Sequence, residues 1–294
     1  MPSEVAIRSF FDELKDVVPL GDPAGQKAVF GCVLADGRQG VLKLVELPTI
    51  TNEDTEAAYN EAAGRLRRET AILASIKSPY VTRLAFPEHA LEIANIDGCE
   101  CAYYFEERIE GPSLEGMISG GVVLDPSLVA RMGAHVACGI DEFWTRDVVH
   151  RDVKPANIMH NDQTDVFVLL DAGYALDLNG PSYTRVLAVV GTLPYFSPEQ
   201  LDLANKRRLD FRSDLYALGV VMYVALAGEH PYLKAGMGQD DQLHAIVNCL
   251  PSPPRAPAAG SEPLWEIVLR LLEKQPHARY RSCELVAEML DVLY

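Results

Sequence analysis

The chain has 294 residues, of which 26 are basic and 42 acidic, giving a net charge of −16. With 48% hydrophobic and 23% charged residues, it can bury a core, and the composition excludes a disordered chain. Its length suggests about two globular units. The negative charge argues against a nucleic-acid binder, because phosphates would be repelled. It is shared equally between residues 1–110 and 111–294, which indicates an acidic surface rather than a tail.

Neither end-of-chain signals nor apolar runs indicate export or a membrane span. Residues 1–4 lack the basic and apolar segments of a secretory signal. The longest apolar run, residues 219–228, has about half of the ~20 residues that cross a bilayer. Cys99 and Cys101 form a C-x-C pair without a second pair at zinc-ligand spacing, which favours reduced thiols over a metal site. We therefore expect a cytoplasmic protein with no membrane span.

The order of predicted elements indicates a β-rich part followed by a helical part. Alternation, helical periodicity and turn residues predict, in chain order, a helix over 4–16, strands over 28–34 and 40–46, a helix over 52–77, strands over 80–86 and 100–109, and helices over 126–147, 213–228, 240–250 and 262–274. Glycine and proline near residues 110–112 mark the change. The prediction is an α+β chain with an N-terminal helical extension (1–17), a β-rich unit (18–110) and a helical unit (111–294).

The segment with the strongest chemical signal is His150-Arg-Asp-Val-Lys-Pro-Ala-Asn157. Its residue types suit phosphoryl transfer. A carboxylate, Asp152, can orient and deprotonate an attacking hydroxyl, and Lys154 can neutralise a γ-phosphate. Asn157 supplies an oxygen ligand for magnesium.

Further segments follow in a fixed order. An apolar run ends in Asp171-Ala-Gly, where a carboxylate at a strand end suits a metal ion. Then come Gly191-Thr-Leu-Pro-Tyr-Phe-Ser-Pro-Glu199, Asp214 at the start of an apolar helix, and Arg279.

Together these segments resemble the protein kinase family, of the Ser/Thr type and closest to bacterial eukaryotic-like kinases, from about residue 18 to about 290. The resemblance implies a bilobal fold with 18–294 as one catalytic domain. It implies that Asn157 and Asp171 hold Mg²⁺, with Mn²⁺ as an alternative. It also implies that Asp214 anchors the loop backbone and that Glu199 pairs with Arg279. Ala172 replaces the usual Phe, and Ser197 replaces an Ala.

In the first half, Gly40-Val-Leu-Lys43 resembles the strand whose lysine holds the α- and β-phosphates of ATP. The resemblance implies a glutamate partner on the next helix. Glu69 fits by position, and Glu61, two turns earlier, is the alternative.

The nucleotide-binding segments depart further from the family pattern. The phosphate-covering loop keeps Gly21 and Gly25, whereas Lys27 replaces the third glycine. Backbone groups of the hinge are expected to meet adenine, and apolar side chains to enclose it; these residues are Glu107, Ile109, Val29, Val41 and Met159. Glu106 falls at the usually apolar gatekeeper position, where a carboxylate needs a partner or a raised pKa. A one-residue shift of the hinge alignment is the alternative explanation.

The resemblance implies a Ser/Thr kinase that uses ATP, modifies protein substrates and phosphorylates itself. Arg151 can pair with a phosphate on the activation segment, for which Thr184 is preferred over Ser182 and Thr192. Thr192 also matches a position with a structural hydroxyl contact. The alternatives are a pseudokinase scaffold and a small-molecule kinase of the aminoglycoside type. A regulatory partner or a dimer is left open.

Overall fold

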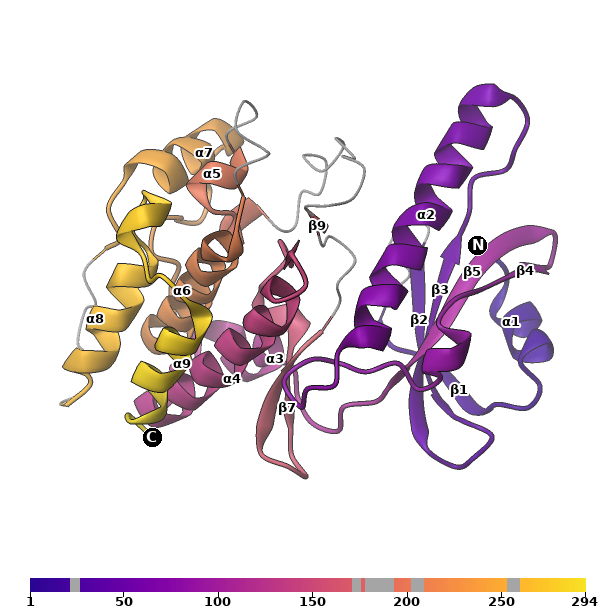
Figure 1. Cartoon of the computed structure of the whole chain (residues 1–294), viewed down its shortest axis with the longest axis horizontal. Coiled ribbons are helices and arrows are strands. Elements are labelled where there is room, and N and C mark those ends of the chain that lie inside the picture. The colour runs from indigo at the N-terminus through magenta and orange to yellow at the C-terminus, as the bar shows by residue number, and fades with distance from the viewer. Residues whose placement is uncertain (22–26, 171–175, 178–192, 202–208, 253–259) are drawn as a thin grey trace. The chain divides into compact units, whose positions relative to one another are not determined.

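Strands gather in the first part of the chain and helices in the second, as the sequence predicts (Figure 1). The computed structural model describes residues 1–21, 27–170, 176–177, 193–201, 209–252 and 260–294. The chain divides into an N-terminal unit, residues 1–77 with 82–109, and a C-terminal unit, residues 78–81 with 110–294. The predicted α+β class is confirmed. Segment 78–81 lies with the C-terminal unit, whereas the sequence placed it in the β-rich one.

The N-terminal unit is built on one five-stranded antiparallel sheet of order β1-β2-β3-β5-β4. Two helices accompany it, and the elements are α1 (Glu4–Phe10), β1 (Lys15–Pro19), β2 (Lys27–Val33), β3 (Gln39–Glu46), α2 (Glu53–Ser75), β4 (Glu92–Ile96) and β5 (Cys99–Glu107). Because successive side chains of a strand point to opposite faces of the sheet, each strand contributes residues to both faces.

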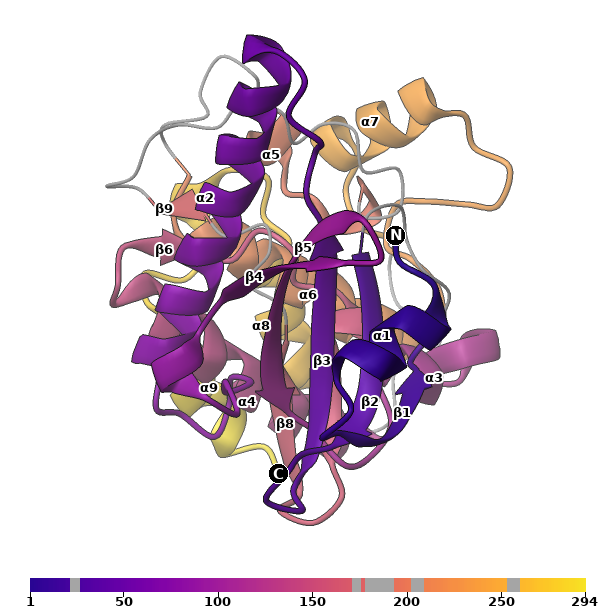
Figure 2. The same cartoon turned by 90° about the vertical axis from the view of Figure 1, so that its right-hand side faces the viewer.

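Helix α1 covers one face of this sheet (Figure 2). Ser3 caps its N-terminus, and Ile7 and Phe11 enter a core that includes Phe30 and Leu44. The helix ends at Phe10, so the prediction of a helix to residue 16 is wrong at its end. Pairing with β2 draws residues 15–19 into an edge strand. The predicted extension is thus part of the N-terminal unit.

Helix α2 lies on the opposite face of the sheet (Figure 1). Adjacent residues of β5 show this: the Tyr103 ring packs edge-on against Phe11, which directly follows α1, with 4.9 Å between ring centroids, whereas the Tyr104 hydroxyl donates to Glu69 of α2. Asn52 and Thr55 form a capping box at the N-terminus of α2. The helix ends at Ser75, two residues before the predicted end.

One predicted strand is wrong and another was missed. Over residues 80–86 the structure has only isolated bridges, from Val81 to Leu169 and from Leu84 to Glu106. The regular strand is β4, joined to β5 through Asp97 and Gly98, which have φ of 54° and 80°. This Asp-Gly turn is a hairpin signal that was present in the sequence.

The C-terminal unit is organised around helix α6, whose side chains are buried along nearly all of its length. Its elements are α3 (Leu114–Ile118), α4 (Pro126–Trp144), β6 (Val148–Val149), β7 (Ile158–Asn161), β8 (Val166–Leu169), β9 (Leu176–Asp177), α5 (Pro198–Leu201), α6 (Phe211–Ala227), α7 (Gln239–Asn248), α8 (Glu262–Leu271) and α9 (Cys283–Asp291). A Cβ on Gly219 would lie 2.7 Å from Cβ of Leu271, so α6 and α8 approach closely only because residue 219 is glycine. Helix α9 was not predicted. Among the described helices, none combines the length and apolar character needed to cross a bilayer.

Replacing Phe11 tests whether the packing of the α1 region on the sheet stabilises the N-terminal unit. Phe11 is 2% exposed and Phe10 is 40% exposed. We expect Phe11→Ala to lower the free energy of unfolding by about 3–5 kcal/mol, because it opens a cavity between α1 and the sheet. Urea unfolding followed by circular dichroism measures this loss. Phe10→Ala is the matched control, and equal losses in both variants would contradict the assignment.

Candidate active site

The segment from His150 to Asn157 is held in shape by a buried carboxylate of α6. Asp214 accepts hydrogen bonds from the backbone N–H groups of His150 at 2.8 Å and Arg151 at 2.7 Å. Arg151 has φ of 68°, a left-handed conformation that a side chain with a Cβ rarely adopts. Burial raises the pKa of Asp214, although the hydrogen bonds from both N–H groups and the nearby charge of Arg151 oppose this rise. Hydrogen bonds between Asp214 and the loop backbone, as the resemblance implies, are present in the structure.

Within this loop, the Asp152 carboxylate contacts two polar residues that follow it in the motif, Lys154 and Asn157. The Lys154 ammonium lies 3.0 Å from Asp152 Oδ1, and Asn157 Nδ2 donates to Asp152 Oδ2 at 2.7 Å. Asn157 Nδ2 also donates to the Asp152 backbone carbonyl at 2.9 Å. Asp152 is 3% exposed. Its carboxylate is therefore fixed in direction and has the Lys154 ammonium beside it.

His150 connects this loop to the strand that leads to Asp171. Its Nδ1 accepts from the Asp152 N–H, so its Nε2 carries the proton and donates to the Leu170 carbonyl at 3.1 Å. The Leu170 N–H donates to the Asn157 carbonyl at 2.8 Å. The residue before Asp171 is thus fixed against the loop, while Asp171 itself lies outside the described residues.

The donor atoms at this loop fit a magnesium ion. The Asn157 amide nitrogen is used by Asp152, so its Oδ1 is the atom left to face a cation. Carboxylate and amide oxygens are the ligands that Mg²⁺ prefers. Asn157 would supply one such oxygen, and strand β8, which ends at Leu169, is followed two residues later by Asp171.

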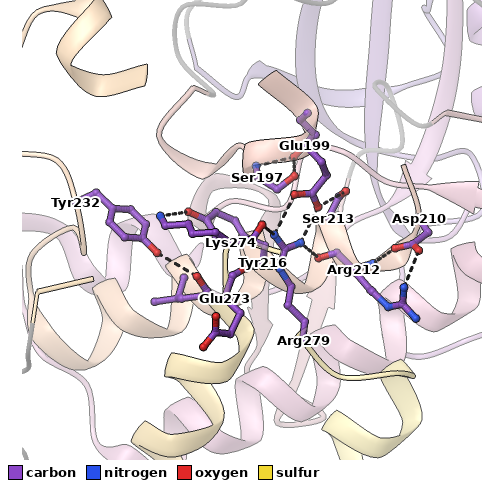
Figure 3. A network of polar contacts seen from close by, with 12 residues as sticks. Ser197, Glu199, Asp210, Arg212, Ser213, Tyr216, Tyr232, Glu273, Lys274 and Arg279 are labelled. Atoms are coloured by element: carbon purple, nitrogen blue, oxygen red, sulfur yellow. Dashed lines mark hydrogen bonds and ion pairs between the residues drawn. The ribbon is translucent and has the colours of Figure 1, made fainter. Parts of the chain in front are cut away.

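A second buried ion pair ties the segment after the loop to the end of the chain (Figure 3). Arg279 donates to both carboxylate oxygens of Glu199, at 2.6 and 2.9 Å, and the Ser213 hydroxyl donates to Glu199 Oε1 at 2.8 Å. Burial opposes ionisation of Glu199, but the hydrogen bonds and charge of Arg279 outweigh it and lower the pKa of this carboxyl. The predicted Glu199–Arg279 pair is present.

Arg279 is also fixed by its surroundings. Its guanidinium donates to the backbone carbonyls of Arg212, Glu273 and Lys274, and it lies 4.8 Å from the Tyr216 ring centroid (Figure 3). All its donors therefore have acceptors, which makes burial of this charge tolerable.

In the N-terminal unit, Lys43 forms an ion pair with a residue on the neighbouring strand. Its Nζ lies 2.7 Å from Glu106 Oε1, and the two side chains are 7% and 4% exposed. Glu106, whose position required a partner, finds it in Lys43.

Glu69, the predicted partner of Lys43, lies in the same neighbourhood. It is buried on α2 and accepts a hydrogen bond from the Tyr104 hydroxyl at 2.6 Å. The Tyr104 ring centroid is 5.7 Å from Lys43 Nζ. A Lys43–Glu69 pair stays a prediction. The alternative, Glu61, is exposed.

The structure brings some of the expected nucleotide-binding residues together. Val29 is paired with Lys43, and Val41 with Glu106, so these four side chains share one face of the sheet. Lys27 opens β2, opposite Val45.

The remaining nucleotide-binding residues are placed as follows. Gly21 has φ of 99°, which suits glycine, while Gly25 lies outside the described residues. The Glu107 N–H donates to the Arg83 carbonyl. Ile109 ends the N-terminal unit, and Met159 lies on β7 of the other unit.

The sequence did not predict three features of the site: the contacts of His150, the place of Tyr104 and the Lys43–Glu106 ion pair. His150 was matched only as part of a motif, yet it is fully buried and joins two segments. Tyr104 and the Lys43–Glu106 contact depend on the register of β3 with β5, which the motifs do not encode. The signal that could have found them is spacing, because residues 104 and 106 point to the same face of a strand. Thr184, Ser182, Thr192 and Ala172 lie outside the described residues.

Comparisons with known proteins match most of the chain. A family model described as "Protein kinase domain" matches residues 24–290. The chain is 32% identical over 232 residues to the serine/threonine-protein kinase PknB of Mycobacterium tuberculosis, an alignment that covers 78% of this chain and 36% of that protein. It is 29% identical over 226 residues to a probable serine/threonine-protein kinase of Streptomyces coelicolor, with 75% and 32% covered. The matched region is thus only about a third of each relative's length.

Glu199→Gln tests the buried ion pair at the end of the chain. Removing the negative charge leaves Arg279 buried without its counter-ion, and we expect a loss of about 3–5 kcal/mol in the free energy of unfolding at neutral pH. Because folding lowers the pKa of Glu199, its contribution is present above the unfolded pKa and is lost as pH falls through the folded value. Urea unfolding across a pH series should therefore show the two proteins converging in acid. Glu273→Gln, an exposed neighbour, is the control and should unfold like the wild type.

Lys43→Met tests how much the Lys43–Glu106 ion pair contributes to stability. It leaves the Glu106 carboxylate buried without its cation, so we expect the free energy of unfolding to fall by about 3–5 kcal/mol. The double variant Lys43→Met/Glu106→Leu should recover most of this loss, since Glu106 no longer leaves a buried carboxylate without its cation. Denaturant unfolding of the three proteins measures the coupling. A single variant as stable as the wild type would contradict it.

Proposed function

Since this chain belongs to the protein kinase domain family, we propose that it is a serine/threonine protein kinase that transfers the γ-phosphate of ATP to hydroxyl groups of proteins. The observation that carries the proposal is the Asp152 carboxylate, buried and held by Lys154 and Asn157. The names of the matched relatives support a Ser/Thr enzyme, and so does a lysine at position 154 of the loop.

The proposed roles follow from the chemistry of each side chain. Asp152 orients the substrate hydroxyl and accepts its proton, while Lys154 stabilises charge on the transferred phosphoryl group. Lys43 binds the α- and β-phosphates. Asn157 and Asp171 hold a divalent cation, Mg²⁺ with Mn²⁺ as the alternative, and this ion neutralises phosphate charge when bound.

Arg151 supports the proposal that the chain is activated by phosphorylation of its own residues 182–192. Its side chain is largely buried, and within the described residues Arg151 Nε has no hydrogen-bond acceptor. A phosphate on Thr184, or on Ser182 as second choice, would supply acceptor oxygens for this guanidinium.

We also propose the location, the substrates and the partners of the enzyme. All six cysteines are free thiols, which supports a cytoplasmic location. Substrates are proteins with accessible Ser or Thr residues, and a regulatory partner or a second copy of the chain could control access to them.

Asp152→Asn tests the proposed chemistry. Asparagine has the same shape, but it cannot accept a proton, and its amide nitrogen cannot accept from Lys154 or Asn157 as the carboxylate does. We expect the turnover number to fall about 10²–10⁴-fold, the range attributed to general acid–base groups, and urea unfolding checks that the variant is still folded. Transfer of radiolabelled γ-phosphate to peptide arrays and to the chain itself provides the measurement.

Two further readouts complete this experiment. Mass spectrometry after incubation with ATP and Mg²⁺ should find phosphate on Thr184 in the wild type and none in Asp152→Asn. Nucleotide binding by a wild-type chain that transfers no phosphate to any protein would instead identify a pseudokinase.

A further inference from the structure

We infer that a cavity in the N-terminal unit, on the face of the sheet that α1 covers, binds an arginine side chain of a partner protein. This cavity, which we call the aromatic cavity, has a volume of about 230 Å³. Four aromatic rings and two carboxylates are among the groups that line it, namely Phe11, Phe86, Tyr103, Phe105, Glu13 and Glu92. The inference does not depend on the proposed phosphoryl transfer.

The strands and the segment after α1 place the four rings side by side. Tyr103 and Phe105 are two residues apart on β5, so their side chains point to the same face of the sheet. The Phe11 ring packs edge-on against both, with centroids 4.9 and 5.9 Å away. Phe86 packs edge-on against Phe105 at 5.7 Å. Rings held at steep angles present faces as well as edges, and a cation is attracted to a ring face.

Two carboxylates approach this cluster from different elements. Glu92, on the edge strand β4, lies opposite Tyr103 in the register and accepts a hydrogen bond from its hydroxyl at 2.7 Å. Glu13, between α1 and β1, lines the same cavity. Burial, the hydrogen bond to Glu92 and the charges of Glu92 and Glu13 together raise the pKa of the Tyr103 hydroxyl. Both carboxylates therefore act on one ring, which makes the aromatic cavity electronegative.

Neither carboxylate is neutralised by a lysine or an arginine within the described part of the chain. The ionisable group beside Glu92 is His89, whose Nδ1 lies 3.5 Å from Glu92 Oε1 and whose side chain is 69% exposed. Glu13 is exposed. The aromatic cavity thus combines apolar walls with two negative charges that the described residues leave open to an outside cation.

The chain itself shows that a guanidinium suits this combination. Arg38 lies 5.8 Å from the centroid of the Phe86 ring, while its Nε pairs with Asp36 at 2.8 Å. One arginine of the chain therefore contacts a ring and a carboxylate at the same time. The aromatic cavity offers rings and carboxylates together, but the described residues that line it include neither lysine nor arginine.

The chemistry of the lining favours arginine over other cations. A guanidinium is planar, so it can stack on a ring, and its five N–H donors can serve two carboxylates at once. A quaternary ammonium would satisfy the rings but has no N–H for Glu13 or Glu92. A lysine ammonium has donors, but it is more strongly hydrated and does not stack. An arginine on an exposed segment of a partner protein meets all these requirements.

Titration of the whole chain with a short peptide tests the inference. The probe is acetyl-Gly-Arg-Gly-amide, and NMR spectra of the chain with ¹³C-labelled phenylalanine and tyrosine rings report on the cavity. We expect saturable shifts of the Tyr103 and Phe105 ring signals. The same peptide with citrulline in place of arginine keeps the shape without the charge. It should bind about tenfold more weakly or worse, because the hydrogen bonds lose their charged donor.

Variants of the cavity provide the second comparison. Glu13→Gln/Glu92→Gln should weaken binding of the arginine peptide about tenfold or more and remove the preference over citrulline. Phe86→Leu should weaken it several-fold, because an apolar side chain without a ring face replaces the aromatic one. Glu56→Gln, exposed on α2, is the control and should bind like the wild type. Urea unfolding checks that each variant is folded, and Glu13→Gln alone, at an exposed position, serves if the double variant is not.

Four results would overturn the inference. Equal affinity for the arginine and citrulline peptides, or unchanged binding in Glu13→Gln/Glu92→Gln, would mean that charge does not select the ligand. Tighter binding of a trimethyllysine peptide would assign the cavity to quaternary ammonium groups. Ring shifts that grow with protein concentration without any peptide would show that a second copy of the chain covers the cavity. A chain that binds the peptide but transfers no phosphate would refute the proposed function alone.

Discussion

The buried carboxylate of Asp214 is the constraint on which the catalytic loop depends. Arg151 adopts a left-handed backbone conformation, which costs about 1–3 kcal/mol for a residue other than glycine. The two N–H groups around this turn donate to Asp214, and without that acceptor they would be buried and unsatisfied. The strained turn and the buried carboxylate thus stabilise each other. Asp152 follows directly, so its direction is set by a residue more than sixty positions later in the chain.

The same end of helix α6 also positions the segment after the loop. Ser213, next to Asp214, donates to Glu199, and Arg279 donates to the Arg212 carbonyl while it holds Glu199. The first turn of α6 therefore positions both the loop from His150 to Asn157 and the segment around Glu199. Since α6 is packed on almost all sides, neither segment can shift without disturbing the core of the C-terminal unit. This explains why the first turn of an apolar helix carries three charged or hydroxyl residues in succession, Arg212, Ser213 and Asp214.

The sequence predicts most reliably where chemistry is local or where a motif carries it. Asp152, Lys154 and Asn157 meet within one short loop, and Glu199 and Arg279 pair as the family resemblance implies. What failed depends on pairing between strands. The helix over 4–16 stops at Phe10 because β2 recruits residues 15–19, and the strand at 92–96 is recognisable only through its Asp-Gly turn. The prediction that Glu106 needs a partner or a raised pKa came from its place at a usually apolar position, whereas the identity of its partner, Lys43, depends on the register of the strands.

The net charge of −16 now has a structural counterpart at the site. Lys43 and Lys154, the lysines expected at phosphates, each already lie against a carboxylate, Glu106 and Asp152. The charge of each lysine is therefore already compensated by a carboxylate. Under the proposed function, each ammonium would share its N–H donors between its carboxylate and a phosphate, so that binding would depend on geometry more than on net attraction. Long-range attraction of a nucleotide to so acidic a chain is weak as well. Binding must then rely on short contacts, and short contacts require lysines held in place before the nucleotide arrives, which is what the carboxylates beside them provide.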